Sequence, residues 1–213
     1  MYKKCIFCLL FLFIISVSTY ATAQYPDKII YNGIEYDLFV NPLEAYLSVN
    51  PDKRPRSNLV STALWRGYVA TFEIVNNELY LKDIKIVIST GDTLITEWVS
   101  VLLEFLDGQP NLKIDWFSGL LVMPYGRLIN YVHMGYGSTY ENYILLEIEN
   151  GNFIRENRMH YLEYVQYRER QYQAFKETQE YLNLLREIGK EISDDLDYFI
   201  KIYESDYTTI ILE

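Results

Sequence analysis

Aromatic and cationic side chains are the residues of this sequence whose types best suit recognition chemistry. Its 213 residues include 21 tyrosines, and each tyrosine combines a flat apolar face with one polar tip. Such side chains suit stacking on sugars and contacts in protein interfaces, although strands in general also favour tyrosine. We expect a ligand or partner surface where aromatic and basic side chains gather in strand and turn segments: Trp65, Arg66, Trp116, Tyr125, Arg127, His133 and Tyr136.

The two histidines are the next candidates for chemistry. His133 lies in an expected strand and could serve as a general base, but a histidine in such a place is more often packed and hydrogen-bonded. His160 comes near Glu156 and Glu163 at helical spacing. The His-Glu-x-x-His pattern of a zinc site is missing, so we expect no metal at these residues.

Motifs of common enzyme classes are missing from the sequence. It has no Gly-x-Ser-x-Gly elbow and no phosphate loop that ends in Gly-Lys-Ser or Gly-Lys-Thr. The string from Gly135 to Ser138 lacks the third glycine of a dinucleotide fingerprint and falls between expected strands, so it indicates a turn. Asp115 and Glu141 could flank a sugar only if the strand register placed both on one face. We therefore lean against an enzyme and expect no cofactor.

The N-terminus has the pattern of a secretory signal peptide. Lys3 and Lys4 precede an uncharged run that extends from Cys5 to Pro26, and the small residues Ala21 and Ala23 suit a signal peptidase. We expect cleavage after Ala23 and export of the bacterial protein to the periplasm or the medium. The alternative is an uncleaved membrane anchor, because about 20 uncharged residues can span a bilayer.

Loss of residues 1–23 would change the composition in two ways. It would leave 190 of the 213 residues and, because two lysines are lost, move the formal net charge from −10 to −12. It would also remove both cysteines, and with them any disulfide, thiol nucleophile or cysteine metal site. The acidic balance argues against nucleic acid and is compatible with a basic protein or a neutral ligand such as a sugar.

Hairpins are expected to dominate the first two thirds of the chain. The dipeptide Asn32-Gly33 lies between two apolar segments and suits a tight turn between antiparallel strands. Alternating apolar residues predict a second hairpin, from Leu64 to Val75 and from Glu78 to Ile88. Further strands are expected over 113–123, 128–134 and 140–149, with a turn at 124–127 and a tight turn at Asn150-Gly151.

Helices are expected in four places. Asn41 can cap a short helix that begins at Pro42, with Glu44 completing a capping box. Apolar residues between Thr93 and Asp107 recur at the helical period, which predicts one amphipathic helix with Trp98 in the core. The pattern is helical again from Met159 to Lys190, and a further helix from Ser193 and a strand over 207–212 are expected near the C-terminus.

These elements predict a single α+β domain over residues 24–213. Residues 24–157 would form a curved antiparallel sheet with the one packed amphipathic helix, and 158–213 a mainly helical section. The pattern leaves open whether residues 158–190 pack on the sheet or project as an arm. No membrane span is expected once the signal peptide is removed.

Three functions are compatible with these features. The first is an exported, soluble and non-enzymatic binding protein of the bacterial cell envelope, with a carbohydrate or protein partner. The second is an acidic inhibitor or immunity-type protein that neutralises a basic effector. The third is an envelope hydrolase that uses carboxylates and His133. Of the three, the hydrolase has the least support from the sequence.

Overall fold

The structure is a computed structural model that describes residues 23–59, 61–89, 96–133, 135–188 and 200–201. Three sequence predictions fall wholly or largely outside these residues: the signal peptide, the helix from Ser193 and the strand over 207–212. In the part of the chain that the structure describes, no helix is long and apolar enough to cross a membrane.

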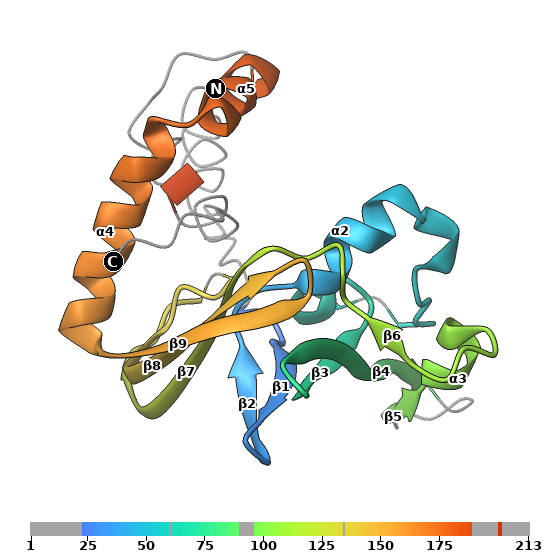
Figure 1. Cartoon of the computed structure of the whole chain (residues 1–213). Coiled ribbons are helices and arrows are strands. Elements are labelled where there is room, and N and C mark those ends of the chain that lie inside the picture. Colours follow the sequence, from blue (N-terminus) through green and yellow to red (C-terminus); the bar gives the residue numbers. More distant parts are fainter. Residues whose placement is uncertain (1–22, 60, 90–95, 134, 189–199, 202–213) are drawn as a thin grey trace, which may run out of the picture.

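Nine strands of the described residues form one open sheet (Figure 1). Their order is β2-β1-β3-β4-β9-β8-β7, and β5 and β6 also pair with β4. β4 and β9 meet at one residue pair, so the sheet has two halves joined at a narrow point. The strands are β1 (Asp27–Tyr31), β2 (Ile34–Leu38), β3 (Val69–Val75), β4 (Glu78–Ser89), β5 (Thr96–Ser100), β6 (Leu112–Lys113), β7 (Gly119–Asn130), β8 (Thr139–Glu149) and β9 (Asn152–His160).

The expected tight turns are confirmed. Asn32-Gly33 joins β1 to β2 with φ angles of 52° and 77°, and Asn150-Gly151 joins β8 to β9 with φ angles of 47° and 72°. Two successive positive φ angles match the right-handed twist of an antiparallel hairpin. Asn76-Asn77 joins β3 to β4 in the same way. These local signals set the position of three hairpins.

The expectation of a wholly antiparallel sheet is wrong at one pairing. β1 pairs with β3 in parallel, with Ile29 opposite Phe72. Parallel neighbours need a long connection, and β2, a helix and a loop separate these two strands along the chain. The sheet is antiparallel at its other pairings among the described residues.

The expected helix over Thr93–Asp107 is wrong for most of its described length. Thr96–Ser100 is strand β5, and only the short helix α3 (Leu102–Leu106) follows it. β5 pairs with β4 from Lys85 to Ser89, most of which β3 does not reach, and so supplies partners for backbone groups there. Trp98, expected in the core, is 43% exposed.

The expected turn at residues 124–127 is also wrong. β7 continues through it from Gly119 to Asn130, and its register against β8 shifts between Tyr125 and Leu128. Gly126 has a φ of 83°. An irregular register bends a strand without ending it, so the glycine bends β7 at this point.

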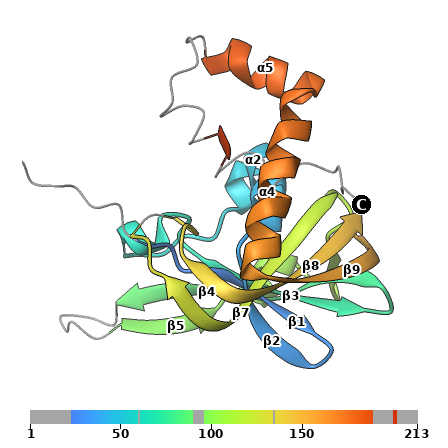
Figure 2. The ribbon, with the colours of Figure 1, turned by 90° about the vertical axis from the view of Figure 1, so that its left-hand side faces the viewer.

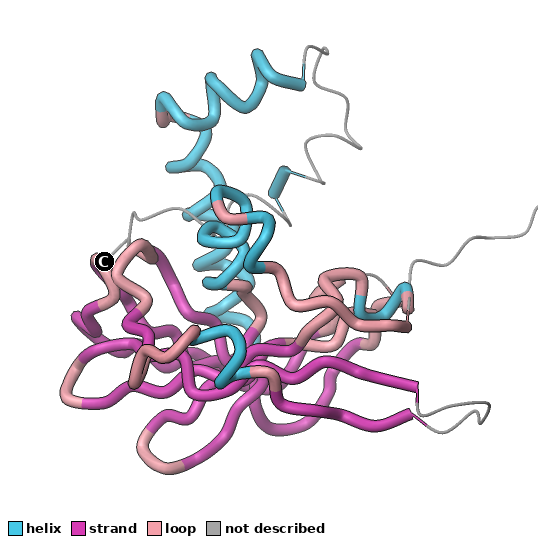
Figure 3. The backbone as a smooth tube through the Cα atoms, turned by 90° about the vertical axis from the view of Figure 1, so that its right-hand side faces the viewer, coloured by secondary structure: helices cyan, strands magenta, loops and turns pink. Residues whose placement is uncertain are grey.

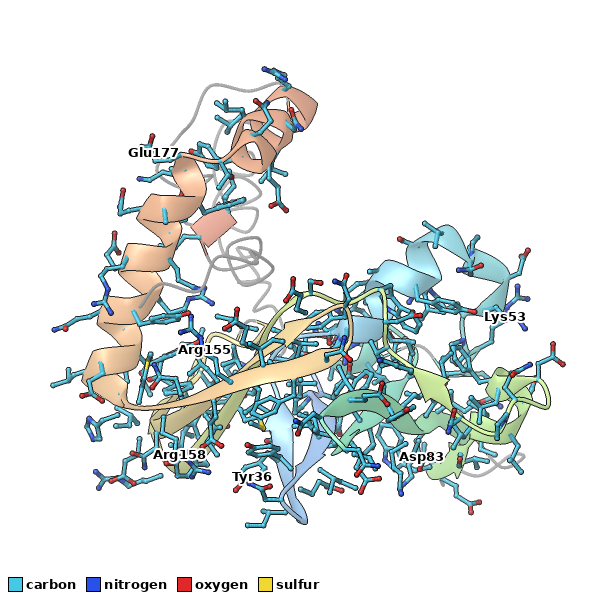
Figure 4. The ribbon with its side chains drawn as sticks, in the orientation of Figure 1. Tyr36, Lys53, Asp83, Arg155, Arg158 and Glu177 are labelled. Atoms are coloured by element: carbon cyan, nitrogen blue, oxygen red, sulfur yellow. The ribbon has the colours of Figure 1, made fainter. Side chains whose placement is uncertain are left out.

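Two helices near the C-terminus form the expected helical section. α4 (Tyr161–Lys176) and α5 (Gln179–Ile188) rise from one side of the sheet (Figures 2 and 3). The first half of α4 packs on the sheet, because the Tyr164 ring stacks on Tyr143 with centroids 3.7 Å apart and Tyr167 belongs to the main core. The far half, which ends beside Glu177 (Figure 4), joins a separate apolar cluster that includes Tyr172 and Tyr181. The first half of α4 therefore packs on the sheet, whereas its far half and α5 extend away from it.

Shorter elements complete the described chain. α2 (Pro42–Val49) starts at the expected residue and buries Leu43 and Leu47. The loop that follows contains two short 3-10 helices, η1 (Pro51–Lys53) and η2 (Thr62–Leu64). The loop brings Trp65 and Arg66 to the start of β3, where the candidate site lies.

Candidate functional site

A cavity of about 620 Å³ lies where the base of α4 faces the loop between β7 and β8. This volume is within the range of pockets that bind small molecules. Its walls come from the segment before β1, the segment after β2, the segment before β3, the loop 135–138, the first half of β8, α4 and Lys201. Six aromatic side chains line it: Phe39, Trp65, Tyr136, Tyr143, Tyr161 and Tyr164.

The aromatic rings of the cavity are held in fixed orientations. Phe39 stacks on Tyr136 with centroids 5.0 Å apart and planes 10° apart. A second stacked pair, Tyr143 and Tyr164, joins β8 to α4. Trp65 is 64% exposed, so much of its indole remains open to a ligand. The cavity therefore combines rigid aromatic walls with one accessible aromatic ring.

Arg66 connects the cavity to a buried polar network. Its Nη2 donates to Asp27 Oδ1 at 3.2 Å and to the Tyr25 carbonyl at 2.9 Å. Its Nη1 donates to the Tyr136 hydroxyl at 2.8 Å. Asp27 Oδ1 also accepts from the Ala70 N–H at 2.9 Å. Arg66 thus holds the cavity loop to the N-terminal segment and to the start of β3.

The Tyr136 hydroxyl also fixes the start of α2. It donates to Asn41 Oδ1 at 2.8 Å, so the Asn41 side chain contacts the cavity loop and makes no cap hydrogen bond to the helix. The prediction that α2 starts after Asn41 is confirmed, but the expected role of its side chain is wrong. The hydrogen bond from Tyr136 takes the place of the expected cap hydrogen bond between the Asn41 side chain and the backbone of α2.

Glu44 likewise serves a different purpose from the expected capping box. Its carboxylate accepts two hydrogen bonds from Arg54, each of 2.9 Å, and one from the Tyr68 hydroxyl at 2.6 Å. Burial pushes the pKa of Glu44 upward, but the hydrogen bonds from Arg54 and Tyr68 outweigh it, so the pKa is lowered. Burial and the nearby negative charges of Asp27 and Glu44 raise the pKa of the Tyr68 hydroxyl.

The charged residues of the cavity wall are engaged with the protein itself. Arg66 pairs with Asp27, and Lys201 pairs with Glu169. Arg168 donates from Nη2 to the Lys201 carbonyl at 2.8 Å. The groups that the described walls offer to a ligand are therefore mainly aromatic faces and neutral polar groups. Such a surface suits an uncharged ligand better than an ion.

Three of the seven residues expected at a ligand surface line this cavity: Trp65, Arg66 and Tyr136. Trp116 lies elsewhere, stacked on Tyr46 with its Nε1 donating to the Pro42 carbonyl at 2.9 Å. A strand was expected over 113–123, but Trp116 lies in the segment between β6 and β7, which is not a strand. Its surroundings indicate packing of α2 against the sheet.

The other three expected residues lie on or just after β7, outside the cavity wall. Tyr125 is half-buried and meets Tyr36 edge to face. Arg127 is exposed in the bend of β7. His133 is exposed beside Tyr131, whose hydroxyl lies 3.4 Å from His133 Nδ1. The seven residues therefore do not form one surface. Only Trp65, Arg66 and Tyr136 lie together, on the cavity wall.

Sequence reasoning missed four of the six aromatic residues of the cavity wall. Phe39 follows β2, while Tyr161 and Tyr164 are three residues apart at the start of α4 and so share one helix face. That spacing was a usable signal. Tyr143 is buried in β8, and the strand pattern gave no sign that α4 would cover it. The missing information was the packing of α4 on β8.

The carboxylates considered for hydrolysis, Asp115 and Glu141, do not come together, and neither do Glu156 and Glu163, which were considered for a metal. Asp115 adjoins Gly151, at the end of β8 opposite to Glu141. Glu156 lies on β9 and accepts from the Tyr31 hydroxyl at 2.6 Å, while the Glu163 carboxylate accepts from the His160 backbone N–H at 2.9 Å. Within the described ranges, no three His, Cys, Asp or Glu side chains are placed to hold a metal.

Comparisons with known proteins add no relative. No family model, no curated protein and no solved structure matches this chain. The function of the cavity must therefore be inferred from the residues that line it.

Proposed function

We propose that this chain is an exported binding protein of the bacterial cell envelope, built as one α+β domain, which holds a neutral carbohydrate in the cavity without catalysis. One observation carries the proposal: six aromatic side chains line a cavity of about 620 Å³ whose charged groups already contact the protein. The C–H faces of a sugar ring pack against aromatic faces, and its hydroxyls need neutral donors and acceptors.

Polar groups suited to sugar hydroxyls lie among the aromatic rings. Asn41, Ser138 and Thr139 line the same cavity as Trp65 and Tyr136. The Ser138 hydroxyl is bonded to the Val132 backbone and Asn41 Oδ1 to Tyr136, whereas the Thr139 hydroxyl has no hydrogen-bond partner among the described residues. Hydroxyl and amide side chains both donate and accept hydrogen bonds, as sugar hydroxyls do. A ligand that fills the cavity would therefore contact apolar faces and neutral polar groups together, which is the pattern that a carbohydrate presents.

Thermal unfolding of the exported form, purified after expression of the full chain, tests this proposal. The protein would be heated with neutral oligosaccharides and with cell-wall fragments. A ligand present at 100 times its dissociation constant adds about 2.7 kcal/mol to the free energy of unfolding, which gives a measurable rise in melting temperature. A dose-dependent rise with a carbohydrate is expected.

Two variants make the test specific to the cavity. Trp65→Ala removes a ring that is 64% exposed on the cavity wall, so it should abolish most of the shift and leave the fold intact. Tyr131→Ala is the control, because its ring is 54% exposed and lies outside that wall. The absence of a shift with every sugar, or an equal loss in both variants, would contradict the proposal.

A further inference from the structure

Exposed aromatic rings continue from the cavity across the neighbouring surface. Trp65, Tyr25 and Trp98 are 64%, 51% and 43% exposed. Only Trp65 belongs to the cavity wall, and Tyr25 and Trp98 lie beyond it. Single exposed aromatic residues are ordinary, whereas rings placed next to one another at the mouth of a cavity form a surface that can take part in binding.

Two hydrogen bonds hold the segment that carries Tyr25 beside the segment that carries Trp65. The Tyr25 N–H donates to the Ala63 carbonyl at 2.9 Å, and Arg66 Nη2 donates to the Tyr25 carbonyl. Tyr25 and Trp65 therefore stand on two segments that run side by side. Gln24, the residue before Tyr25, lines the cavity and donates from Nε2 to the Thr62 carbonyl at 2.8 Å.

Trp98 is the third exposed aromatic residue, and it lies on the sheet. Its ring meets the Tyr25 ring edge to face, with centroids 5.7 Å apart and planes 70° apart. It stands on β5, opposite Val87 of β4, so the sheet fixes its position (Figure 2). Trp65 is thus on the cavity wall, and Tyr25, on the adjoining segment, contacts Trp98.

We infer that these three residues form an aromatic platform that binds the units of a linear neutral glycan lying outside the cavity. This inference rests on the proposed function, and it names the ligand as a chain that is longer than the cavity holds. Successive sugar rings present successive apolar faces, so a row of aromatic rings matches a linear glycan. A mono- or disaccharide in the cavity would leave Trp98 without a ligand contact.

Continuity with the cavity is the reason for choosing a glycan over a protein partner. The platform begins at Trp65, which belongs to both surfaces, and no charged side chain is among its three members. A chain anchored in the cavity would reach Tyr25 and then Trp98 in order. Each added contact joins a unit that is already tethered, so affinity should rise with chain length.

Binding of a length series of sugars to the exported form tests the inference. The probes are linear cello-, malto-, xylo- and chito-oligosaccharides from dimer to hexamer, measured by isothermal titration calorimetry. We expect the hexamer of the preferred series to bind more tightly than its dimer. Trp98→Ala should weaken hexamer binding about tenfold, equivalent to ~1.4 kcal/mol, and leave dimer binding unchanged.

Matched variants separate the platform from the cavity. Trp65→Ala should weaken dimer and hexamer alike, whereas Tyr25→Ala should resemble Trp98→Ala. Leu103→Ala, which changes a side chain 86% exposed on the nearby α3, is the control and should bind every length as the parent does. Circular dichroism would establish that each variant is folded.

The possible failures are distinguishable. Equal affinity of dimer and hexamer, both lost in Trp65→Ala, would overturn the platform and leave the proposed function standing. Binding of no sugar of any length would overturn both. An envelope protein whose binding to the parent is lost in Trp98→Ala would show that the platform recognises a protein, and so would overturn the glycan inference.

Discussion

Arg66 and Asp27 form an ion pair in which both side chains are almost completely buried, with exposed fractions of 2% and 0%. Their facing atoms are 3.2 Å apart, yet Asp27 Oδ2 and Arg66 Nε have no hydrogen-bond partner in the described part of the chain. A buried ion pair with unfilled hydrogen-bonding positions adds little to the free energy of unfolding. Removing either charge, however, leaves the other buried without its partner and destabilises the protein. The pair also positions Tyr136 on the cavity wall.

The first prediction concerns pH. Burial raises the pKa of Asp27 from 3.8 to about 6, because the loss of hydration outweighs attraction to Arg66. A raised folded pKa means that the stabilising contribution is fully present below pH 3.8 and is lost as the pH rises through about 6. The free energy of unfolding of the parent should therefore fall, relative to that of Asp27→Asn, between pH 4 and 7.

The expected size of that change is about 3 kcal/mol, from the difference between the two pKa values. Urea unfolding of both proteins at several pH values measures it, and the difference between them removes the contribution of other carboxylates. Glu44, the other carboxylate that acts on Asp27, is present in both proteins. A difference that stays constant between pH 4 and 7 would show that the pKa of Asp27 is not raised in the folded protein.

The second prediction concerns the hydroxyl that joins the loop to the buried pair. Tyr136→Phe keeps the stacking on Phe39 but leaves Arg66 Nη1 and Asn41 Oδ1 without this partner. The loss should lower the free energy of unfolding by about 1–3 kcal/mol. Tyr140→Phe is the control, because that ring also contacts Phe39 and its hydroxyl makes no hydrogen bond to any residue that the structure describes. Equal stabilities of the two variants would count against the network.

Local chemistry explains which elements the sequence predicts well. Asn32-Gly33 and Asn150-Gly151 adopt positive φ angles through their own residue types, so their turns are visible without tertiary information. The start of α2 at Pro42 is equally local. The functional contacts of Asn41 and Glu44 are not, because both side chains bond to residues distant in the sequence.

Long-range pairing explains the largest error of the sequence analysis. Residues 96–100 carry a helical pattern of apolar residues, but Thr96 and Val99 are β-branched and β4 offers them a backbone partner. The exposed position of Trp98 follows from that pairing. The cavity was predictable only in part for the same reason, since it forms where α4 packs beside residues 135–139.

The third prediction compares two turn glycines. A Cβ at Gly151 would lie 2.6 Å from the Ile114 carbonyl oxygen, whereas a Cβ at Gly33 would have nothing within 4 Å. Both residues have positive φ, so Gly33→Ala measures the backbone strain alone, about 1–2 kcal/mol. Gly151→Ala should lose a further 1–3 kcal/mol, because the contact is with backbone that cannot rotate away.

Chemical denaturation of both alanine variants measures the comparison. Circular dichroism before denaturation establishes that each variant still forms the sheet. If the two variants lose equal stability, the close approach of Gly151 to Ile114 does not exist in solution. The turn between β8 and β9 would then be less tightly packed than the structure shows.

The last prediction concerns export. Cleavage after Ala23 would make Gln24 the first residue, and the Gln24 main-chain N already donates to the Gly135 carbonyl at 3.3 Å. The new terminal ammonium could keep that contact and would strengthen it through its charge. We expect the exported protein to lack residues 1–23, as measured by intact mass and N-terminal sequencing. Ala21→Leu with Ala23→Leu should block the cut, because the peptidase needs small residues there. An exported parent protein that retains residues 1–23 would instead support an uncleaved membrane anchor.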